Sequence, residues 1–275
     1  LGGMLALGLS LAYVLWAQSQ GQQAADFVPV TMGITAVLFA AAALVTFSLL
    51  RERAVVPTAG ASSTTGWRDA LQQLRSTFER ARDHRDFMWL LGCAVAYQGG
   101  VAVTIALAAI YAEQVIGFAP QETMVLIFVL NIAAFVGAFV FGYAQDRIGH
   151  KLALALTLLG WILTCMIAAL SENKAQFWWA AAIAGVCMGS SQSSGRAMAG
   201  LMVPPARLGE FFGLWTFAIR LASIVGPLSY GLITWLSGGN QRFAIGATSL
   251  LFVLGLALLM PVDVARGRRM ALGQD

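Results

Sequence analysis

Long apolar runs separated by short polar segments dominate this chain of 275 residues. Several runs reach about 20 residues with almost no charge, the length that an α-helix needs to cross a hydrocarbon layer about 30 Å thick. They lack the apolar/polar alternation of membrane-barrel strands. Because lipid offers the backbone no hydrogen-bond partner, each run is predicted to be a membrane-spanning helix. The predicted spans are residues 1–17, 28–50, 88–112, 122–144, 152–170, 175–198, 209–236 and 241–262.

The predicted fold class is therefore all-α, a polytopic membrane helix bundle with about eight transmembrane helices. The composition agrees, since 59% of residues are hydrophobic and only 11% are charged, against roughly 25% charged in an ordinary soluble domain. The chain starts at Leu1 inside an apolar run, with no charged segment before it that would indicate a cleavable signal peptide. We interpret the sequence as a fragment that has lost its N-terminal part.

The basic residues are distributed asymmetrically over the predicted connections. Most of the 17 Lys and Arg residues fall between the second and third spans, after the fourth, around the turn between the sixth and seventh, and in the tail. Only Lys174 and Arg242 fall on the opposite side. Because short cytoplasmic loops collect Lys and Arg, this pattern predicts a multi-pass protein of the cell (inner) membrane with a cytoplasmic C-terminus. The pI of 9.3 is thus a topology signal, and no nucleic-acid partner is expected.

Cysteine and histidine give no indication of a metal site. Cys93, Cys165 and Cys187 fall inside predicted helices without metal-ligand spacing, and we interpret them as small apolar core residues. His84 and His150 fall in predicted loops and lack the neighbours that a metal would require. No metal or cofactor is expected.

The longest connection, residues 51–87, divides into a flexible VVPTAGASSTTG stretch and a predicted helix. In the helical part, Trp67, Leu71, Leu74 and Phe78 recur at helical spacing, with Arg and Asp on the other face. Such a helix either lies along the inner leaflet or is a solvated linker. Both readings make the segment a boundary between two membrane bundles.

The stretch GYAQDRIGHK, residues 142–151, places charged side chains between two apolar runs. Gly142 would let a neighbouring backbone approach, Gly149 would permit a sharp turn, and Asp146 could accept bonds from a helix N-terminus or pair with an Arg. Arg147 and Lys151 would keep the loop in the cytoplasm. A simple positively charged turn would also explain this pattern.

Gly142, Asp146, Arg147, Gly149 and Lys151 resemble the G-x-x-x-D-R-x-G-R-K signature of the major facilitator superfamily, with His150 in place of the usual Arg. The resemblance implies a cytoplasmic latch that holds helices together in one of two alternating states.

A second passage, residues 209–258, is similar to the last two helices of one branch of that superfamily, the bacterial permeases related to the vacuolar amino-acid effluxers of autophagy. The similar residues are Glu210 to Trp215, Arg220, Gly226, Pro227 and Gly239 to Arg242, and the stretch from Ser190 to Pro205 also resembles that branch. The resemblance implies that residues 88–262 form a C-terminal six-helix bundle and residues 1–50 the last two helices of an N-terminal bundle. Residues 51–87 would be a cytoplasmic linker and residues 263–275 a cytoplasmic tail. The missing N-terminal helices of the same protein would then be partners of this chain.

One departure from that branch concerns a coupling carboxylate. The family usually carries Asn-Asp-Gly where this chain has Gln98, Gly99 and Gly100. No acid occurs at the depth of a midplane site, so a coupling acid would lie in the missing helices, or transport would be facilitated.

Arg220 is the one ionisable residue that the sequence places deep in a span, and it is the leading candidate for binding or gating an anionic solute. A structural pairing of Arg220 with a carboxylate or helix end is the alternative. Tyr97, Gln98 and Asn131 are further candidates for solute contact, although interhelical hydrogen bonding would equally explain Asn131.

Two other features of the spans have open readings. Gly226 and Pro227 interrupt the backbone ladder of their helix, which predicts either a hinge or a static kink. The serine run 190–194 lies near Gly185, Gly189 and Gly195, and we expect it to mediate close helix packing.

These features favour a secondary transporter (permease) that moves a small solute by alternating access. Amino acids or related metabolites are implied as substrates only by the family resemblance. Efflux of drugs or amphiphiles is an alternative, and so is a non-transporting membrane scaffold. An enzyme is not expected, because no paired carboxylates, His cluster or nucleophile with a base at workable spacing occurs in the sequence. The expected partners are the lipid bilayer and a small-molecule solute.

Overall fold

A computed structural model describes residues 2–22, 24–49 and 75–273 of the chain. These residues contain no strand, and the predicted all-α fold class is confirmed. The chain divides into two units, Leu1–Gly66 and Trp67–Asp275. In the first unit, α1 (Gly2–Ser19) packs against α2 (Ala24–Leu49). The assignment of these two helices to an N-terminal bundle stays a prediction.

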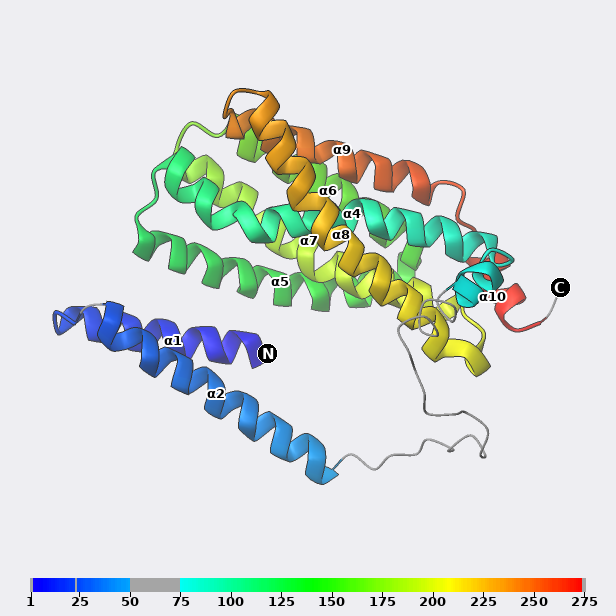
Figure 1. Cartoon of the computed structure of the whole chain (residues 1–275), viewed down its shortest axis with the longest axis horizontal. Coiled ribbons are helices and arrows are strands. Elements are labelled where there is room, and N and C mark those ends of the chain that lie inside the picture. Colours follow the sequence, from blue (N-terminus) through cyan, green and yellow to red (C-terminus); the bar gives the residue numbers. More distant parts are fainter. Residues whose placement is uncertain (1, 23, 50–74, 274–275) are drawn as a thin grey trace. The chain divides into compact units, whose positions relative to one another are not determined.

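The second unit is a bundle of long helices (Figure 1). A π-helical turn, η1, continues α4 at its C-terminal end, and a 3-10 turn, η2, precedes α8. The elements are α4 (Arg85–Tyr111), η1 (Ala112–Ile116), α5 (Pro120–Ile148), α6 (His150–Leu170), α7 (Lys174–Leu201), η2 (Pro205–Arg207), α8 (Leu208–Leu236), α9 (Gln241–Leu259) and α10 (Val264–Ala271).

All eight predicted spans coincide with helices of the described residues. Six of these helices are long and apolar enough to cross a membrane. The apolar part of α1, Leu5–Ser19, is shorter than that criterion requires. Helix α7 has 28 residues but is more polar, because it carries the serine run. The apolar length or hydropathy of α1 and α7 is too low to hold them in lipid, so both depend on contacts with neighbouring helices.

Aromatic side chains fill the centre of the second unit. Tyr97 of α4 is fully buried, and Trp161 of α6 stacks on Phe252 of α9 with ring centroids 5.3 Å apart. Phe87 packs edge-on against Phe211, joining α4 to α8. Such ring pairs add about 1 kcal/mol beyond their buried area. Helix α4 is therefore the element around which α8 and α9 are organised.

Small residues allow two helix pairs to approach closely. A Cβ atom on Gly189 of α7 would lie 1.9 Å from the carbonyl oxygen of Ala134 in α5, and one on Gly185 would lie 2.6 Å from that of Leu130. A Cβ on Gly226 of α8 would likewise lie 2.1 Å from the Gly99 oxygen of α4. The predicted close packing around Gly185 and Gly189 is confirmed. Backbone contact of this kind substitutes for a hydrophobic driving force in lipid.

The described part of the linker is helical over residues 75–81. Trp67, Leu71 and Leu74 of the predicted apolar face lie outside the described residues, and Phe78 is exposed. Arg80 reaches Glu210, in the first turn of α8, at 3.4 Å. Both side chains are substantially exposed, so this ion pair contributes at most about 1 kcal/mol.

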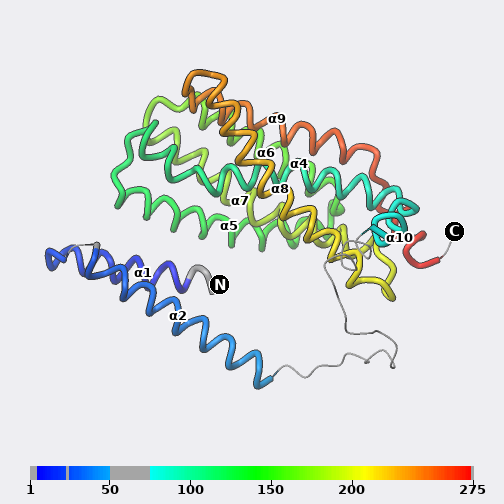
Figure 2. Tube along the Cα trace, viewed as in Figure 1, coloured from blue at the N-terminus to red at the C-terminus, as the bar shows by residue number. Residues whose placement is uncertain are grey.

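The tail, which the sequence did not predict to be helical, forms α10 and docks beside the start of α4 (Figure 2). Asp86 is 3% exposed and accepts hydrogen bonds from Arg266 Nε and Nη2, each at 2.7 Å. It also accepts the backbone N–H of Asp263 at 2.8 Å. The carboxylate of Asp263 caps α10, and the bonds from the N–H groups of Arg266 and Ala265 hold the pKa of Asp263 below its usual range. Asp86 therefore pins α10 to the bundle.

Replacing Asp86 by Asn is expected to release α10. The substitution removes the charge from a bidentate pair, and a hydrogen bond to a charged group contributes about 1.5 kcal/mol or more. Trypsin should therefore cleave at the arginines of α10 roughly tenfold faster, as measured by release of a C-terminal tag from the full-length protein. Asp83→Asn, in the exposed turn before α4, is the matched control. Equal cleavage rates in the two variants would contradict the assigned role of Asp86.

Candidate functional site

The polar run of α7 joins three other helices, reaching mid-length of α4 and α6 and the C-terminal end of α5. Ser191 and Ser194 are fully buried. The indole N–H of Trp161 donates to Ser191 at 3.5 Å, and Ser194 donates to Gln145 Oε1 at 3.0 Å. Gln192 reaches α4. One helix thus contacts α6, α5 and α4 through three neighbouring polar side chains.

Gln98 and Gln192 form a reciprocal amide pair between α4 and α7. The Gln98 Nε2 group donates to Gln192 Oε1 at 3.3 Å, and the Gln192 Nε2 group donates to Gln98 Oε1 at 3.2 Å. Gln98 Nε2 also lies 3.4 Å from the Tyr97 hydroxyl oxygen. Gly195 leaves the room that this hydroxyl needs, since a Cβ there would lie 2.3 Å from it. Each amide keeps at least one donor or acceptor position for a third group.

Arg220 lies on the exposed face of α8, about 18 Å along the helix axis from its first residue. It shares that face with Gly213, Thr216 and Ser223, all exposed, at spacings of three or four residues. The opposite face packs against α4 at Gly226. Within the described residues, no hydrogen bond or ion pair reaches the guanidinium. A cation without a partner in the described part of the chain therefore lies near mid-length of a long helix.

Asn131 lies apart from Gln98 and Arg220. Its side-chain amide donates to the carbonyl oxygen of Ile127, one turn earlier in α5, at 2.8 Å. It lines a cavity of about 230 Å³ with Thr104 and Trp161. Its amide oxygen and the Thr104 hydroxyl are the polar groups that this cavity offers.

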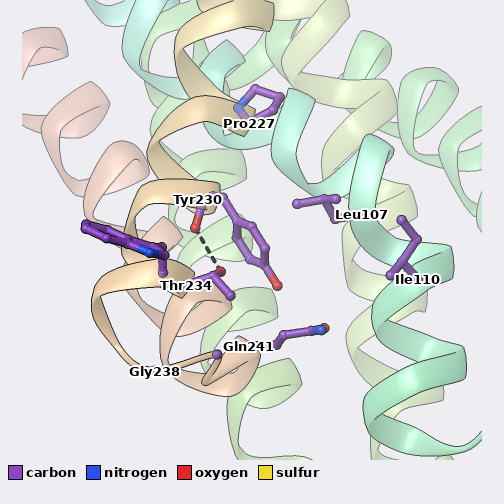
Figure 3. Close-up of a pocket in the computed structure, with 10 residues that line it drawn as sticks. Leu107, Ile110, Pro227, Tyr230, Thr234, Gly238 and Gln241 are labelled. Atoms are coloured by element: carbon purple, nitrogen blue, oxygen red, sulfur yellow. Dashed lines mark hydrogen bonds between the residues drawn. The ribbon is translucent and has the colours of Figure 1, made fainter.

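A larger pocket, of about 630 Å³, lies between the C-terminal halves of α4 and α8 (Figure 3). Leu107 and Ile110 of α4 form one wall, and Tyr230 and Thr234 of α8 form the other. Pro227 also lines it. Because Pro227 lacks the N–H that would bond to the carbonyl of Ser223, α8 is weakest where this pocket begins.

The 142–151 turn has a mixed outcome. Gly149 has φ +85°, so the predicted sharp turn is confirmed. Lys151 donates to the carbonyl oxygens of Met260 and Val262, both at 2.7 Å, and thereby caps the end of α9. Arg147 contacts the hydroxyl and ring of Tyr143 within its own helix.

The other two residues of that turn make no such contacts. Asp146 is exposed and has no ion-pair partner among the described residues. Among the described residues, no atom outside its own helix backbone lies within 4 Å of a Cβ placed on Gly142, so a close approach at Gly142 stays a prediction. The latch role of this turn stays a prediction.

The structure thus places the consecutive residues Tyr97 and Gln98 in one hydrogen-bonded group and leaves Asn131 and Arg220 at separate places. It adds Gln192, which the sequence suggested only as part of a packing run. The available signal in the sequence was a Gln within a run of serines. Serines alone suffice for close helix packing, whereas the longer side chain of Gln can reach a polar group on a neighbouring helix. Gly226 and Pro227 lie at the α4–α8 crossing and at the edge of the pocket respectively.

Comparisons with known proteins agree on one family. The family model described as "Vacuole effluxer Atg22 like" matches residues 1–272. The chain is 25% identical over 191 residues to the uncharacterized MFS-type transporter YxiO of Bacillus subtilis, covering 70% of this chain and 44% of the relative. It is 27% identical over 220 residues to Autophagy-related protein 22-1 of Aspergillus niger, covering 74% of this chain and 35% of the relative. The chain therefore spans less than half the length of these relatives.

A solved structure supports the fold. A bacterial homolog of the human lysosomal transporter Spinster, in an inward-facing and unoccupied conformation, matches with a TM-score of 0.53 and 16% identity, over 98% of this chain and 66% of that one. The family and this neighbour are transporters rather than enzymes. The resemblance seen in residues 142–151 and 209–258 is confirmed, and the chain is a multi-pass membrane protein that belongs to the vacuole effluxer Atg22-like family, with the fold of major facilitator (MFS) transporters.

Proposed function

We propose that the full-length protein is a secondary transporter that moves a small solute across the membrane by alternating access, with amino acids or related metabolites as its substrate class. Family membership supports the transport activity. The single observation that carries the substrate class is Arg220, whose guanidinium lies near the middle of α8 and has no partner within the described residues.

The energetics of Arg220 support a binding role. An arginine at the centre of a membrane helix costs about 3 kcal/mol on insertion scales, so it persists where it faces water or an anionic group. The planar guanidinium matches a carboxylate with two parallel hydrogen bonds. A solute carboxylate would neutralise Arg220 only in the loaded state. Loading would therefore stabilise the state of the protein that is closed around the solute.

Tyr97, Gln98 and Asn131 are proposed as further polar contacts that the solute meets along its path, at places separate from Arg220. The Gln98–Gln192 pair holds α4 against α7 while no solute is bound, and each amide can exchange its partner for a solute amine or carboxylate at little cost. Asn131 and Thr104 offer a second polar place in the 230 Å³ cavity.

Two devices are proposed to control the change of state. Asp146 and Arg147, both exposed, together with Gly142, Gly149 and Lys151, form the latch, for which the missing N-terminal helices supply the partner. The Gly226–Pro227 step is the hinge, because bending α8 there costs no further backbone hydrogen bond. A bend at Pro227 would change the width of the pocket in Figure 3.

The proposed location is the inner membrane of a bacterial cell, with the end of the bundle that carries α10 and the C-terminus in the cytoplasm. The basic residues of the 75–82 segment, the 142–151 turn and α10 support this orientation. At the other end, Lys174 pairs with Glu122, and Arg242 donates to the carbonyl oxygen of Ser171, so both have local structural uses.

The test is transport by purified full-length protein in proteoliposomes. Radiolabelled amino acids should show saturable uptake or efflux that empty liposomes lack, and unlabelled substrate should compete. Amphipathic cations, tested in parallel, should move no faster than in empty liposomes. Saturable movement of the amphiphiles alone would instead establish drug efflux. Movement of neither class, with protein that is folded and inserted, would point to a scaffold and end the proposal.

A further inference from the structure

A wide pocket lies at the end of the bundle that carries α10, bounded by the start of α6, the end of α7 and α10. Its volume is about 980 Å³. The basic or titratable side chains that line it are His150, Lys151, Arg268 and Arg269. Apolar side chains, among them Leu152 and Leu201, line the rest. The pocket is separate from the Gln98–Gln192 pair, from Asn131 and from Arg220.

The described side chains give this pocket charge of one sign. No Asp or Glu among the described residues lines it. Arg268 and Arg269 are exposed, and within the described residues no ion pair reaches either of them. Helix α6 begins at the pocket, and its N-cap residue, Gly149, supplies no side-chain cap, so the first N–H groups of α6 add positive potential. The Nδ1 atom of His150 is buried and has no partner among the described residues. These groups together favour an anion.

The rest of the lining favours acyl chains. Ile148, Leu152 and Leu272 line the pocket and are each between 42% and 51% exposed. Two belong to the helices α5 and α6, which cross the membrane, and the third follows α10. A cationic rim above an apolar wall that continues into the hydrocarbon layer is complementary to a phospholipid, whereas a free anion would leave the apolar wall in water.

The pocket is built rather than incidental. Asp86 holds α10 through Arg266, and the sulfur of Met202, which directly follows α7, lies 2.8 Å from a Cβ placed on Gly267, so α10 seats closely on the bundle. Lys151 is held at its site by the carbonyl oxygens of Met260 and Val262. The seating of α10 fixes the backbone that carries Arg268 and Arg269, so less conformational entropy is lost when an anion arrives.

We propose that this pocket binds the headgroup of an anionic phospholipid, with Arg268, Arg269 and the start of α6 contacting the phosphate and with Ile148, Leu152 and Leu272 contacting the acyl chains. The bound lipid bridges α6 and α10. It thereby ties the tail of the chain to the membrane surface at the end of the bundle where the predicted latch lies.

The experiment is native mass spectrometry of the purified full-length protein titrated with phosphatidylglycerol in detergent, with phosphatidylcholine of the same acyl chains as the zwitterionic probe. Phosphatidylglycerol should bind saturably and at least tenfold more tightly. Arg268→Gln/Arg269→Gln should weaken that binding roughly thirtyfold, since each basic residue near an anionic lipid contributes about a factor of five. Arg269→Gln alone should weaken it about fivefold and remains decisive if the double variant does not fold. Inorganic phosphate at millimolar concentration should not displace the lipid.

Arg82→Gln/Arg207→Gln is the matched control, because it removes two exposed charges at the same end of the bundle outside the pocket. It should bind phosphatidylglycerol as the parent protein does. The proposal is overturned by an equal loss in this control, by unchanged binding in Arg268→Gln/Arg269→Gln, by equal affinity for the two lipids, or by displacement with inorganic phosphate, which would mark a site for free anions.

Discussion

Replacing Arg220 by Ala should lower the transport of a carboxylate-bearing solute about a hundredfold. The guanidinium is the one cation near mid-length of α8 and has no partner within the described residues. Removing one side of a desolvated charge pair costs about 2–5 kcal/mol, and the lower end of that range is already a factor of about thirty. The measurement is initial uptake rate against solute concentration in proteoliposomes, at equal amounts of inserted protein.

Two further variants separate binding from bulk charge. Arg220→Lys keeps the charge but loses the planar fork, so it should retain part of the affinity for the solute. Arg207→Gln removes a charge next to the first turn of the same helix and should transport normally. If Arg220→Ala transports with the affinity of the parent protein, Arg220 has no place in the solute site, and the structural pairing considered from the sequence becomes its explanation.

Replacing Gly226 by Val should disrupt the bundle. The new Cβ would lie 2.1 Å from the Gly99 carbonyl oxygen, and the contact is with backbone, which cannot rotate away. Helices α4 and α8 would have to separate, at a cost of about 3 kcal/mol or more. For a unit of the size of this bundle, about 200 residues, that corresponds to a fall in melting temperature of roughly 10 °C. Thermal unfolding of the detergent-solubilised full-length protein, followed by size-exclusion chromatography, measures it.

Gly231 provides the matched control on the same helix. It is exposed, and nothing lies within 4 Å of a Cβ placed there. Gly231→Val therefore makes the same change in composition and helix propensity without the backbone contact, and its melting temperature should stay within a few degrees of the parent. Equal melting temperatures for the two valine variants would show that the α4–α8 crossing tolerates a side chain at Gly226.

The positions of the helices could be predicted from hydropathy, but their ends could not. The span predicted at 88–112 is part of a helix that begins at Arg85 and continues through the π-turn to Ile116. The span predicted at 122–144 runs from Pro120 to Ile148. Hydropathy reports the thickness of the hydrocarbon layer. Helices continue beyond that layer wherever the polar residues at their ends form hydrogen bonds or ion pairs. Hydropathy contains no information on those contacts.

The polar partners depend on packing that sequence spacing does not contain. Gln98 was a candidate from its place in a span, yet its partner Gln192 lies 94 residues away. Asp86 and Arg266 are 180 residues apart, and each resembles an ordinary charge at a helix end. Their pairing follows from the way in which α4 and α9 bring their ends together. Arg220 could be singled out from the sequence because a charge deep in an apolar run is conspicuous without any partner.

The serine and glutamine side chains that α7 extends to α4, α5 and α6 have a consequence for biogenesis. A segment this polar partitions poorly from the translocon into lipid by itself, whereas its three neighbours are apolar enough to enter one after another as they are synthesised. Since Gln98, Gln145 and Trp161 all precede α7 in the chain, they are already in the bilayer when it emerges and can satisfy its polar groups on arrival. Because α4, α5 and α6 are synthesised first, they provide the polar partners within the membrane that α7 requires.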